Sequence, residues 1–249
     1  MRTSSTTSVA PDPMHNSLLA ALPATEREQL LPHLELVPLT LGQNVHAAGD
    51  TNVFFPDGAI FALLHATDDG GSVEISVVGN EGLVGIALWM GGTAALNQAV
   101  VQGPGHAWRL DGKVLREEFG HEGELQQLVL RYSQALLVQM TQTAACNWHH
   151  PVYQRLCRWL LLTLDRLPSN QLVMTQELVA TILGVGADEL AEAASKLQRL
   201  GAITFTRGQI TILNRPQLER LACECYAVVK GASDRLFPPA RQFMLRSII

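Results

Sequence analysis

The stretch of sequence that decides the fold is residues 173–212, which read VMTQELVATILGVGADELAEAASKLQRLGAITFTRGQITI. A first helix is expected after Thr175, whose hydroxyl can cap it, because apolar residues recur there at helical spacing. Gly184 ends this helix, since glycine accepts the left-handed conformation of a C-terminal cap. Two short helices in direct succession are therefore predicted.

The second helix starts beyond the turn at Gly184 to Gly186 and has Asp188 in its first turn, where a carboxylate suits the positive end of the helix dipole. Gly201 ends it. Apolar residues then alternate with polar ones on both sides of Arg207-Gly208, which predicts a two-stranded hairpin. The whole pattern is typical of a winged helix-turn-helix, and an ordinary helical hairpin with an edge β-ribbon is the alternative.

Length and composition favour a globular protein of two domains, because the chain has 249 residues of which 47% are hydrophobic. No apolar run is long enough to span a bilayer, and residues 1–13 lack the apolar core of a signal peptide, so we expect a cytoplasmic protein. Residues 1–149 carry 6 Lys and Arg against 15 Asp and Glu, whereas residues 150–249 carry 12 against 8. Only the C-terminal part is suited to phosphates.

Glycine-rich sequence marks the N-terminal half, since 12 of the 20 glycines lie between Gly42 and Gly105. They separate short runs of β-forming residues, which predicts a small antiparallel barrel or jelly roll with a hairpin tip at residues 68–71. Within it, the segment 78–85 would let backbone amides approach a ligand closely. The alternative is that these glycines only serve turns and bulges.

A short helix is predicted at residues 112–120 and a long one at residues 121–147. The long helix has two apolar stripes, which need two surfaces to bury them. One stripe can pack on the barrel while the other meets the same helix of a second subunit, and the alternative is a helix buried within one subunit. The residues assigned to the dimer helix are Leu125, Val129, Tyr132, Leu136 and Met140.

His149-His150-Pro151 breaks the long helix and is expected to be a hinge, because Pro151 disfavours helical backbone at His150. A helix at residues 152–167 should follow, and a last amphipathic helix at residues 217–236. The expected division is a tail at 1–15, a sensor barrel at 16–120, a dimerisation helix at 121–149, a winged helix-turn-helix domain at 150–237 and a tail at 238–249.

Four cysteines are present, Cys146, Cys157, Cys223 and Cys225. They lack the spacing of a zinc site or an iron–sulfur cluster. On a helix, Cys223 and Cys225 would point to different faces. We therefore expect reduced, mostly buried thiols and no metal.

Several segments in this order resemble the CRP/FNR family of transcription regulators. They are Phe54-Phe55-Pro56, the barrel segment 78–85, Tyr132 to Leu136, Gln142 to Asn147, Arg155 to Leu161 and the winged helix-turn-helix. The resemblance covers about Asn16 to Phe237. It implies an α+β fold with a cyclic-nucleotide-binding-like barrel, and a homodimer whose helix-turn-helices enter successive major grooves of a palindromic DNA site.

The sensor half departs from that family. Its cyclic-nucleotide binders use a Gly-Glu pair and an Arg-Ser-Ala turn, but the matching positions here are Gly85-Ile86 and residues 96–99. No Lys or Arg lies between Glu28 and Trp108, so no guanidinium can pair with a phosphate. Cyclic AMP is not expected as a ligand and no cofactor is identified. The resemblance assigns the effector pocket to Gly79, Glu81, Gly82, Gly85, Asn97 and Gln98.

The recognition helix departs as well. Family members present Arg and Glu near its start and another Arg a turn later, where this chain has Ala187, Asp188 and Glu192. Carboxylates can accept a hydrogen bond from cytosine, but phosphate repulsion opposes their approach. The expected DNA-contacting residues are Thr175, Gln176, Gly186, Ala187, Asp188, Glu189, Glu192, Lys196, Arg199 and Arg207.

The resulting hypothesis is a non-enzymatic, dimeric transcription regulator with double-stranded DNA and RNA polymerase as partners. No nucleophile elbow, metal-ligand spacing or phosphate loop indicates an enzyme. The alternative is a regulator that kept the fold but acts through protein partners, which the acidic recognition helix favours.

Overall fold

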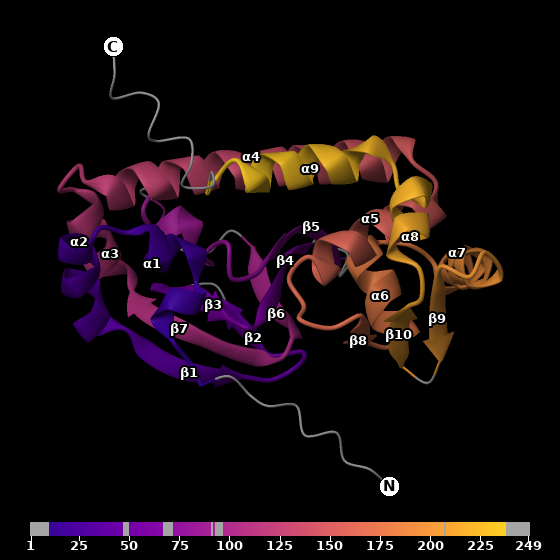
Figure 1. Ribbon diagram of the computed structural model, residues 1–249, viewed down its shortest axis with the longest axis horizontal. Coiled ribbons are helices and arrows are strands. Elements are labelled where there is room, and N and C mark those ends of the chain that lie inside the picture. The colour runs from indigo at the N-terminus through magenta and orange to yellow at the C-terminus, as the bar shows by residue number, and fades with distance from the viewer. Residues whose placement is uncertain are drawn as a thin grey trace, which may run out of the picture.

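The computed structural model describes residues 10–46, 50–66, 72–90, 92, 97–206 and 208–237. Two β-sheets form one side of the molecule, a winged helical domain forms the other, and the long helix α4 (Glu124–His149) runs along the top of both (Figure 1). This arrangement confirms the α+β prediction. The hairpin tip predicted at residues 68–71 lies outside the described residues.

Short helices open the described chain. α1 (Ser17–Ala21) and α2 (Ala24–Leu30) lie on the two sides of Pro23, as the sequence predicted. Asn16 caps α1 by accepting the N–H groups of Leu18 and Leu19. Single 3₁₀ turns occur at Pro13–His15, Leu31–His33 and Ile86–Leu88.

The strands form two antiparallel sheets, one with the order β1-β7-β3 and the other with the order β2-β6-β4-β5. The two sheets bury the aromatic and aliphatic residues between them, among them Val53, Phe55 and Phe61. The strands are β1 (Glu35–Leu39), β2 (Asn44–His46), β3 (Asn52–Asp57), β4 (Ile60–Ala66), β5 (Ser72–Val78), β6 (Gln98–Gly103) and β7 (Gly105–Asp111). The predicted antiparallel β-domain is confirmed, with the described strands in two sheets rather than one ring.

α3 (Gly112–Phe119) connects the sheets to α4. The first turn of α4 is capped from a distance, because the Glu26 carboxylate accepts the N–H groups of Glu124 and Leu125 at 2.9 and 2.8 Å. These N–H groups have no partner within their own helix, so a carboxylate from α2 stabilises the end of α4.

The C-terminal domain confirms the predicted winged helix-turn-helix. It consists of α5 (Val152–Leu164), β8 (Gln171–Val173), α6 (Gln176–Leu183), α7 (Ala187–Arg199), β9 (Ile203–Thr206) and β10 (Gln209–Ile212). The predicted hairpin is β9–β10, and β8 adds a third strand on the other side of β10.

The single helix predicted at residues 217–236 is wrong. The chain forms α8 (Arg215–Leu221) and α9 (Glu224–Asp234), separated by extended backbone at Ala222 and Cys223. α9 then folds back along α4 (Figure 1). No glycine or proline marks the break in the sequence, and the buried contact of Cys223 and Cys225 with Cys146 accompanies it.

The barrel and the C-terminal domain share a hydrophobic core. Ile60 of β4 and Val77 of β5 belong to the same buried cluster as Leu156 and Trp159 of α5. α6 also packs on β5. The winged domain is therefore held against the sheets by apolar burial and not by α4 alone. Among the described helices, none has both the length and the hydropathy needed to cross a membrane.

Candidate DNA interface and effector cavity

α6 and α7 hold the geometry of the helix-turn-helix. The Thr175 hydroxyl accepts the N–H of Leu178 at 3.3 Å and caps α6. Gly184 ends α6 with a φ of 60°, a conformation that favours glycine. The inner faces of both helices carry buried apolar side chains, which are Val179, Ile182, Leu190 and Leu197. The outer face of α7 is left in solvent.

One exposed stripe runs along that outer face. It consists of Asp188, Glu192, Ser195 and Arg199, which recur at helical spacing. Carboxylates fill its first half, and the guanidinium of Arg199 lies in the last turn. The stripe therefore offers hydrogen-bond acceptors first and a cation at its end.

Two of the predicted contact residues are engaged within the domain. The Glu189 carboxylate accepts the N–H of Gly186 at 2.9 Å and so caps its own helix. The Lys196 Nζ lies 3.3 Å from the centre of the Tyr153 ring, a cation–π contact. Both groups are therefore less available to DNA than the exposed stripe. Of the other predicted residues, Thr175 and Gln176 are exposed at the start of α6, and Gly186 and Ala187 are exposed at the start of α7. Arg207 lies outside the described residues.

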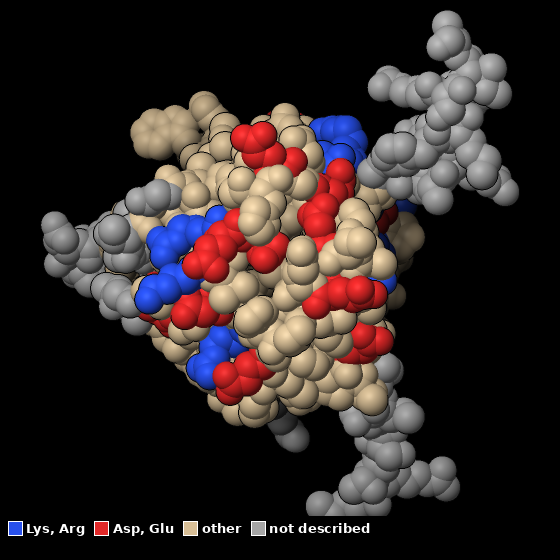
Figure 2. Space-filling view, turned by 90° about the vertical axis from the view of Figure 1, so that its left-hand side faces the viewer, with Lys and Arg blue, Asp and Glu red and all other residues tan. Residues whose placement is uncertain are grey.

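The opposite end of the molecule is unsuited to DNA. Figure 2 looks at the end formed by α2 and α3, which Figure 1 places far from α7. Red carboxylates are spread across this end, with blue cations scattered among them. The excess of carboxylates on this face agrees with the excess of Asp and Glu in residues 1–149. A polyanion would therefore be repelled there.

An apolar cavity of about 230 Å³ lies between the barrel and α4. The barrel contributes residues around Val84 to Ala87, and α4 contributes the face around Ser133 to Met140. No described residue that lines it is charged. Its lining is Leu63, Val84, Gly85, Ile86, Ala87, Met90, Asn97, Ser133, Leu136, Leu137 and Met140. The Ser133 hydroxyl is already used, since it donates to the Val129 carbonyl at 2.6 Å.

The structure divides the predicted effector residues among four places. Gly85 and Asn97 line the apolar cavity, whereas Gln98 is exposed on β6. Gly82 touches α4, because a Cβ on it would lie 2.4 Å from the Tyr132 ring. Gly79 and Glu81 face α5 and α9 instead. These six residues therefore do not form a single pocket.

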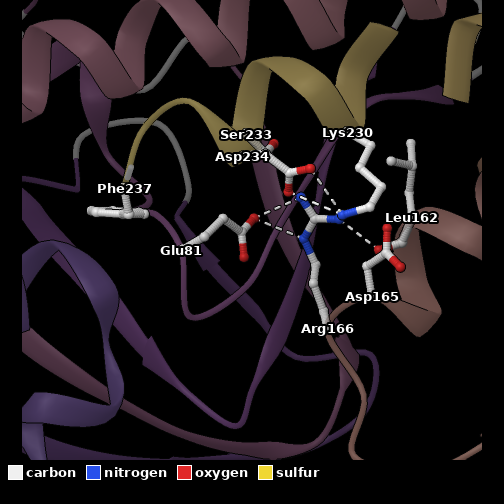
Figure 3. Close-up of a pocket in the computed structure, with 8 residues that line it drawn as sticks. All are labelled: Glu81, Leu162, Asp165, Arg166, Lys230, Ser233, Asp234 and Phe237. Atoms are coloured by element: carbon white, nitrogen blue, oxygen red, sulfur yellow. Dashed lines mark hydrogen bonds and ion pairs between the residues drawn. The ribbon is translucent and has the colours of Figure 1, made fainter. Parts of the chain in front are cut away.

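Glu81 links the barrel to the winged domain (Figure 3). Its Oε1 accepts the Nε of Arg166 at 2.8 Å, and the Arg166 Nη2 lies 2.6 Å from the same oxygen. Arg166 lies just beyond α5, and its side chain is only 7% exposed. The pair borders a charged pocket of about 450 Å³ that Lys230 and Asp234 of α9 also line. We interpret Glu81 as a contact between domains rather than a ligand contact.

A second polar contact joins the two domains. Glu74 of β5 is buried, and its Oε2 accepts the Trp159 indole N–H at 3.4 Å. Burial raises the pKa of this carboxyl to about 8, although Arg158, the indole and Arg166 favour the charged form. Periodicity could not have identified Glu74, since a single carboxylate in an alternating strand is expected to face solvent.

Comparison with known proteins agrees with this geometry. Residues 154–221, from α5 to the end of α8, match the Crp-like helix-turn-helix domain. This chain has the CRP/FNR architecture. No curated protein sequence matches it at a significant level. The sequence resemblance to the CRP/FNR family is thus confirmed in the fold and in the C-terminal domain.

Solved structures support the CRP/FNR fold over most of the chain. A CRP/FNR-family transcriptional regulator from Eubacterium rectale has 15% identity and a TM-score of 0.67, covering 83% of this chain and 98% of that one. FixK2 from Bradyrhizobium japonicum has 14% identity and a TM-score of 0.66, covering 76% and 98%. The c-di-GMP-responsive regulator CLP from Xanthomonas campestris has 16% identity and a TM-score of 0.58, covering 77% and 100%. The proteins from E. rectale and X. campestris are described as regulators.

The long helix of this CRP/FNR fold is oriented differently from the sequence assignment. Leu125, Val129, Tyr132 and Leu136 are buried against the chain's own sheets, and Met140 is half-buried beside them. The stripe assigned to the dimer seam is therefore the barrel-facing stripe. The physical reason is that both stripes are apolar, so periodicity cannot tell which of them meets the barrel.

A different stripe of α4 is exposed. Leu130, Gln134, Leu137, Thr141, Ala144 and Trp148 are all exposed and follow one another at intervals of four and three residues, the spacing of a heptad repeat. Leu137 is 58% exposed and Trp148 is 84% exposed. The heptad spacing in the sequence is the signal that identifies this stripe, including its polar members Gln134 and Thr141.

Proposed function

We propose that this protein is a homodimeric transcription regulator that binds duplex DNA through α7 and responds to a small uncharged ligand. The observation that carries the proposal is the exposed stripe of α7 within a Crp-like helix-turn-helix domain. In such a domain the second helix lies in the major groove and presents its outer face to base edges. A DNA-binding role implies a cytoplasmic protein with RNA polymerase as a partner.

The chemistry of the stripe defines the expected contacts. Asp188 and Glu192 can accept hydrogen bonds from the exocyclic amine of cytosine. Arg199 can pair with a phosphate, and the exposed Thr175 and Gln176 can bond to phosphates at the start of α6. Specificity should therefore come from carboxylates and affinity from few cations, which predicts modest and strongly site-dependent binding.

The test is selection of bound duplexes from a random-sequence pool, followed by fluorescence anisotropy on the enriched duplex at several salt concentrations. A palindrome is expected, because a two-fold dimer presents two copies of α7. Arg199→Ala should weaken binding to all duplexes alike and reduce the salt slope by about 1. Glu192→Ala should relax discrimination at one position by about 1–3 kcal/mol. Arg220→Ala, an exposed arginine on α8, is the matched control.

The dimer is proposed to form through the exposed heptad stripe of α4. Two copies of this stripe would bury Leu130, Leu137 and Trp148, which a monomer leaves in water. Light scattering after gel filtration should give a dimer for the natural chain and a monomer for Leu137→Glu. Leu213→Glu places the same charge on an exposed leucine outside α4 and should leave the dimer intact. A monomeric natural chain would refute this part of the proposal.

The ligand is proposed to be small, uncharged and mainly apolar. The cavity between barrel and α4 exceeds the roughly 150 Å³ that holds benzene in an engineered protein cavity, and its described lining carries no charge. A cyclic nucleotide would bury a phosphate there without a cation, which is costly. Calorimetry should therefore show no binding of cyclic AMP, and Ala87→Leu should abolish the binding of any apolar compound found by screening. Binding of cyclic AMP in this cavity would overturn the assignment.

A second candidate function rests on the acidic first half of α7. Asp188 and Glu192 would repel phosphates, so the fold could act through protein partners instead. One experiment separates the two functions. If the natural chain fails to bind DNA only because α7 lacks cations, replacing Ala187 and Glu192 by Arg should create DNA affinity. Enrichment of a palindrome by the natural chain would exclude this second candidate.

A further inference from the structure

Four side chains with metal-binding groups meet where α4 ends and α9 begins. They are Cys146 and His150 from α4 and its cap, and Cys223 and Cys225 from the start of α9. Their ligand atoms all lie within 4.8 Å of one another. The Cys146 and Cys223 Sγ atoms are 3.5 Å apart, and the Cys225 Sγ is 3.6 Å from the His150 Nδ1.

These distances fit a tetrahedral metal site. With Zn–S bonds of about 2.3 Å, neighbouring ligand atoms of a tetrahedron lie about 3.8 Å apart. Three cysteines and one histidine are among the ligand sets of structural zinc sites. A disulfide would join only two of the four groups and would leave His150 without a role.

The local backbone turns all four groups inward. Cys146 and His150 are four residues apart and so lie on one face of α4, and Pro151 keeps His150 extended at the helix end. Cys223 is the N-cap of α9, outside the helix, so its side chain is directed like that of Cys225. The expectation that the two thiols face different sides is therefore wrong.

The start of α9 is a position that suits negative charge. Cys223 is the N-cap of α9 and Cys225 lies in its first turn, where helix N–H groups stabilise negative charge. Metal ligands must be deprotonated, so this position suits thiolates that bind a metal.

Glu224 supports the histidine. Its Oε1 lies 3.4 Å from the His150 Nε2, while the other ring nitrogen faces Cys225. Histidines that bind metals commonly donate their second ring N–H to a carboxylate, which orients the ring. Glu224 is placed for that purpose.

Two buried arginines of α5 act electrostatically on the cluster. Arg158 is 4% exposed and donates to the Thr143 hydroxyl at 3.0 Å, and Arg155 is also buried. Both arginines interact electrostatically with Cys146. Among the described residues, neither forms an ion pair with a carboxylate. A divalent cation bound by three thiolates and a neutral histidine carries one net negative charge. A metal centre here would therefore partly compensate the positive charges of Arg155 and Arg158.

We infer that Cys146, His150, Cys223 and Cys225 form a binding site for Zn²⁺ that fastens the start of α9 to the end of α4. Because α5 begins directly after Pro151, the metal also fixes the point where the long helix meets the winged domain. The break between α8 and α9 gains a physical reason, since it is what brings Cys223 to the site.

The experiment uses the full-length chain, purified under reducing conditions and stripped of metal. Zn²⁺ is added, unbound ion is removed by gel filtration, and the metal is measured by mass spectrometry. One zinc per chain is expected, and it should protect thiols from a thiol-reactive dye. In a parallel titration, Co²⁺ should give the visible bands of a tetrahedral thiolate complex.

Matched variants locate the metal. Cys146→Ser, Cys225→Ser and His150→Ala should each lose stoichiometric Zn²⁺. Cys157→Ala removes the fourth cysteine, which lies in a different buried cluster, and should keep it. Glu224→Ala should weaken Zn²⁺ binding by about 10- to 100-fold without changing the Co²⁺ bands.

The Co²⁺ titration is done on the natural chain, so its result does not depend on whether a variant folds. No metal on a chain with four titratable thiols would overturn the proposal. So would zinc retained by Cys146→Ser, or an iron–sulfur chromophore. A Cys146–Cys223 disulfide formed by a chain that binds no metal when reduced would show a redox pair instead.

Discussion

Replacing the buried Glu74 by Gln should stabilise the protein, and the gain should grow with pH. Glu74 lies at the contact between β5 and α5, where Trp159, Arg158 and Arg166 face it. Burial raises the pKa of the carboxyl from 4.5 to about 8. Gln is neutral at every pH and keeps an oxygen that can accept the Trp159 N–H.

The magnitude follows from proton linkage. Between pH 4.5 and 8 the folded chain holds a proton on Glu74 that the unfolded chain releases, so stability falls as pH rises through this window. At pH 7 the cost is about 3 kcal/mol, because each pH unit above the ordinary pKa is worth about 1.4 kcal/mol. The cost stops growing above about pH 8.

Urea unfolding of both proteins at about pH 4.5, 6 and 8 measures the difference. The two chains should be equally stable at the lowest pH, and the Gln variant should unfold at higher urea as the pH rises. Glu35→Gln is the control, since Glu35 is exposed and its ion pair with Arg109 should contribute less than about 1 kcal/mol. A constant difference between wild type and Glu74→Gln across the series would refute the reasoning.

Two further substitutions test close contacts. Gly82→Ala should destabilise the protein by about 1–3 kcal/mol, because the new Cβ would lie 2.4 Å from the buried Tyr132 ring. The control is Gly231→Ala on α9, where the new Cβ has room, and it should raise the melting temperature. Equal effects of the two substitutions would contradict the close packing of Gly82 on Tyr132. Arg166→Ala should lower the free energy of unfolding by about 1–3 kcal/mol, because it breaks the partly buried ion pair with Glu81. A double-mutant cycle with Glu81→Gln should show that the two substitutions are coupled. Additive effects on the free energy of unfolding would argue against this link between the domains.

The winged helix-turn-helix could be predicted from local signals alone. Thr175 and Gly184 mark the ends of α6, and the alternation around Gly208 marks the hairpin. These signals lie within a few residues of the structures they specify, so they can be recognised without the rest of the chain. The break between α8 and α9 has no such local signal, and the prediction of one helix failed there.

The candidate sites were predicted less completely, because they depend on which faces meet. Periodicity identified two apolar stripes on α4 but could not decide that Leu136 faces the barrel and Leu137 faces solvent. The family resemblance assigned Glu81 to the effector pocket, whereas the structure pairs it with Arg166 of the winged domain, 85 residues further along the chain.

The sequence by itself determined the order of parts, the class of most elements, the acidic and basic halves and the exposed carboxylates of α7. Only the tertiary structure decided the apolar cavity, the burial of Glu74 and the meeting of Cys146, His150, Cys223 and Cys225. The reason is physical: hydrogen-bonded local structure depends on neighbours in the chain, whereas burial and ligand geometry depend on groups that only folding brings together.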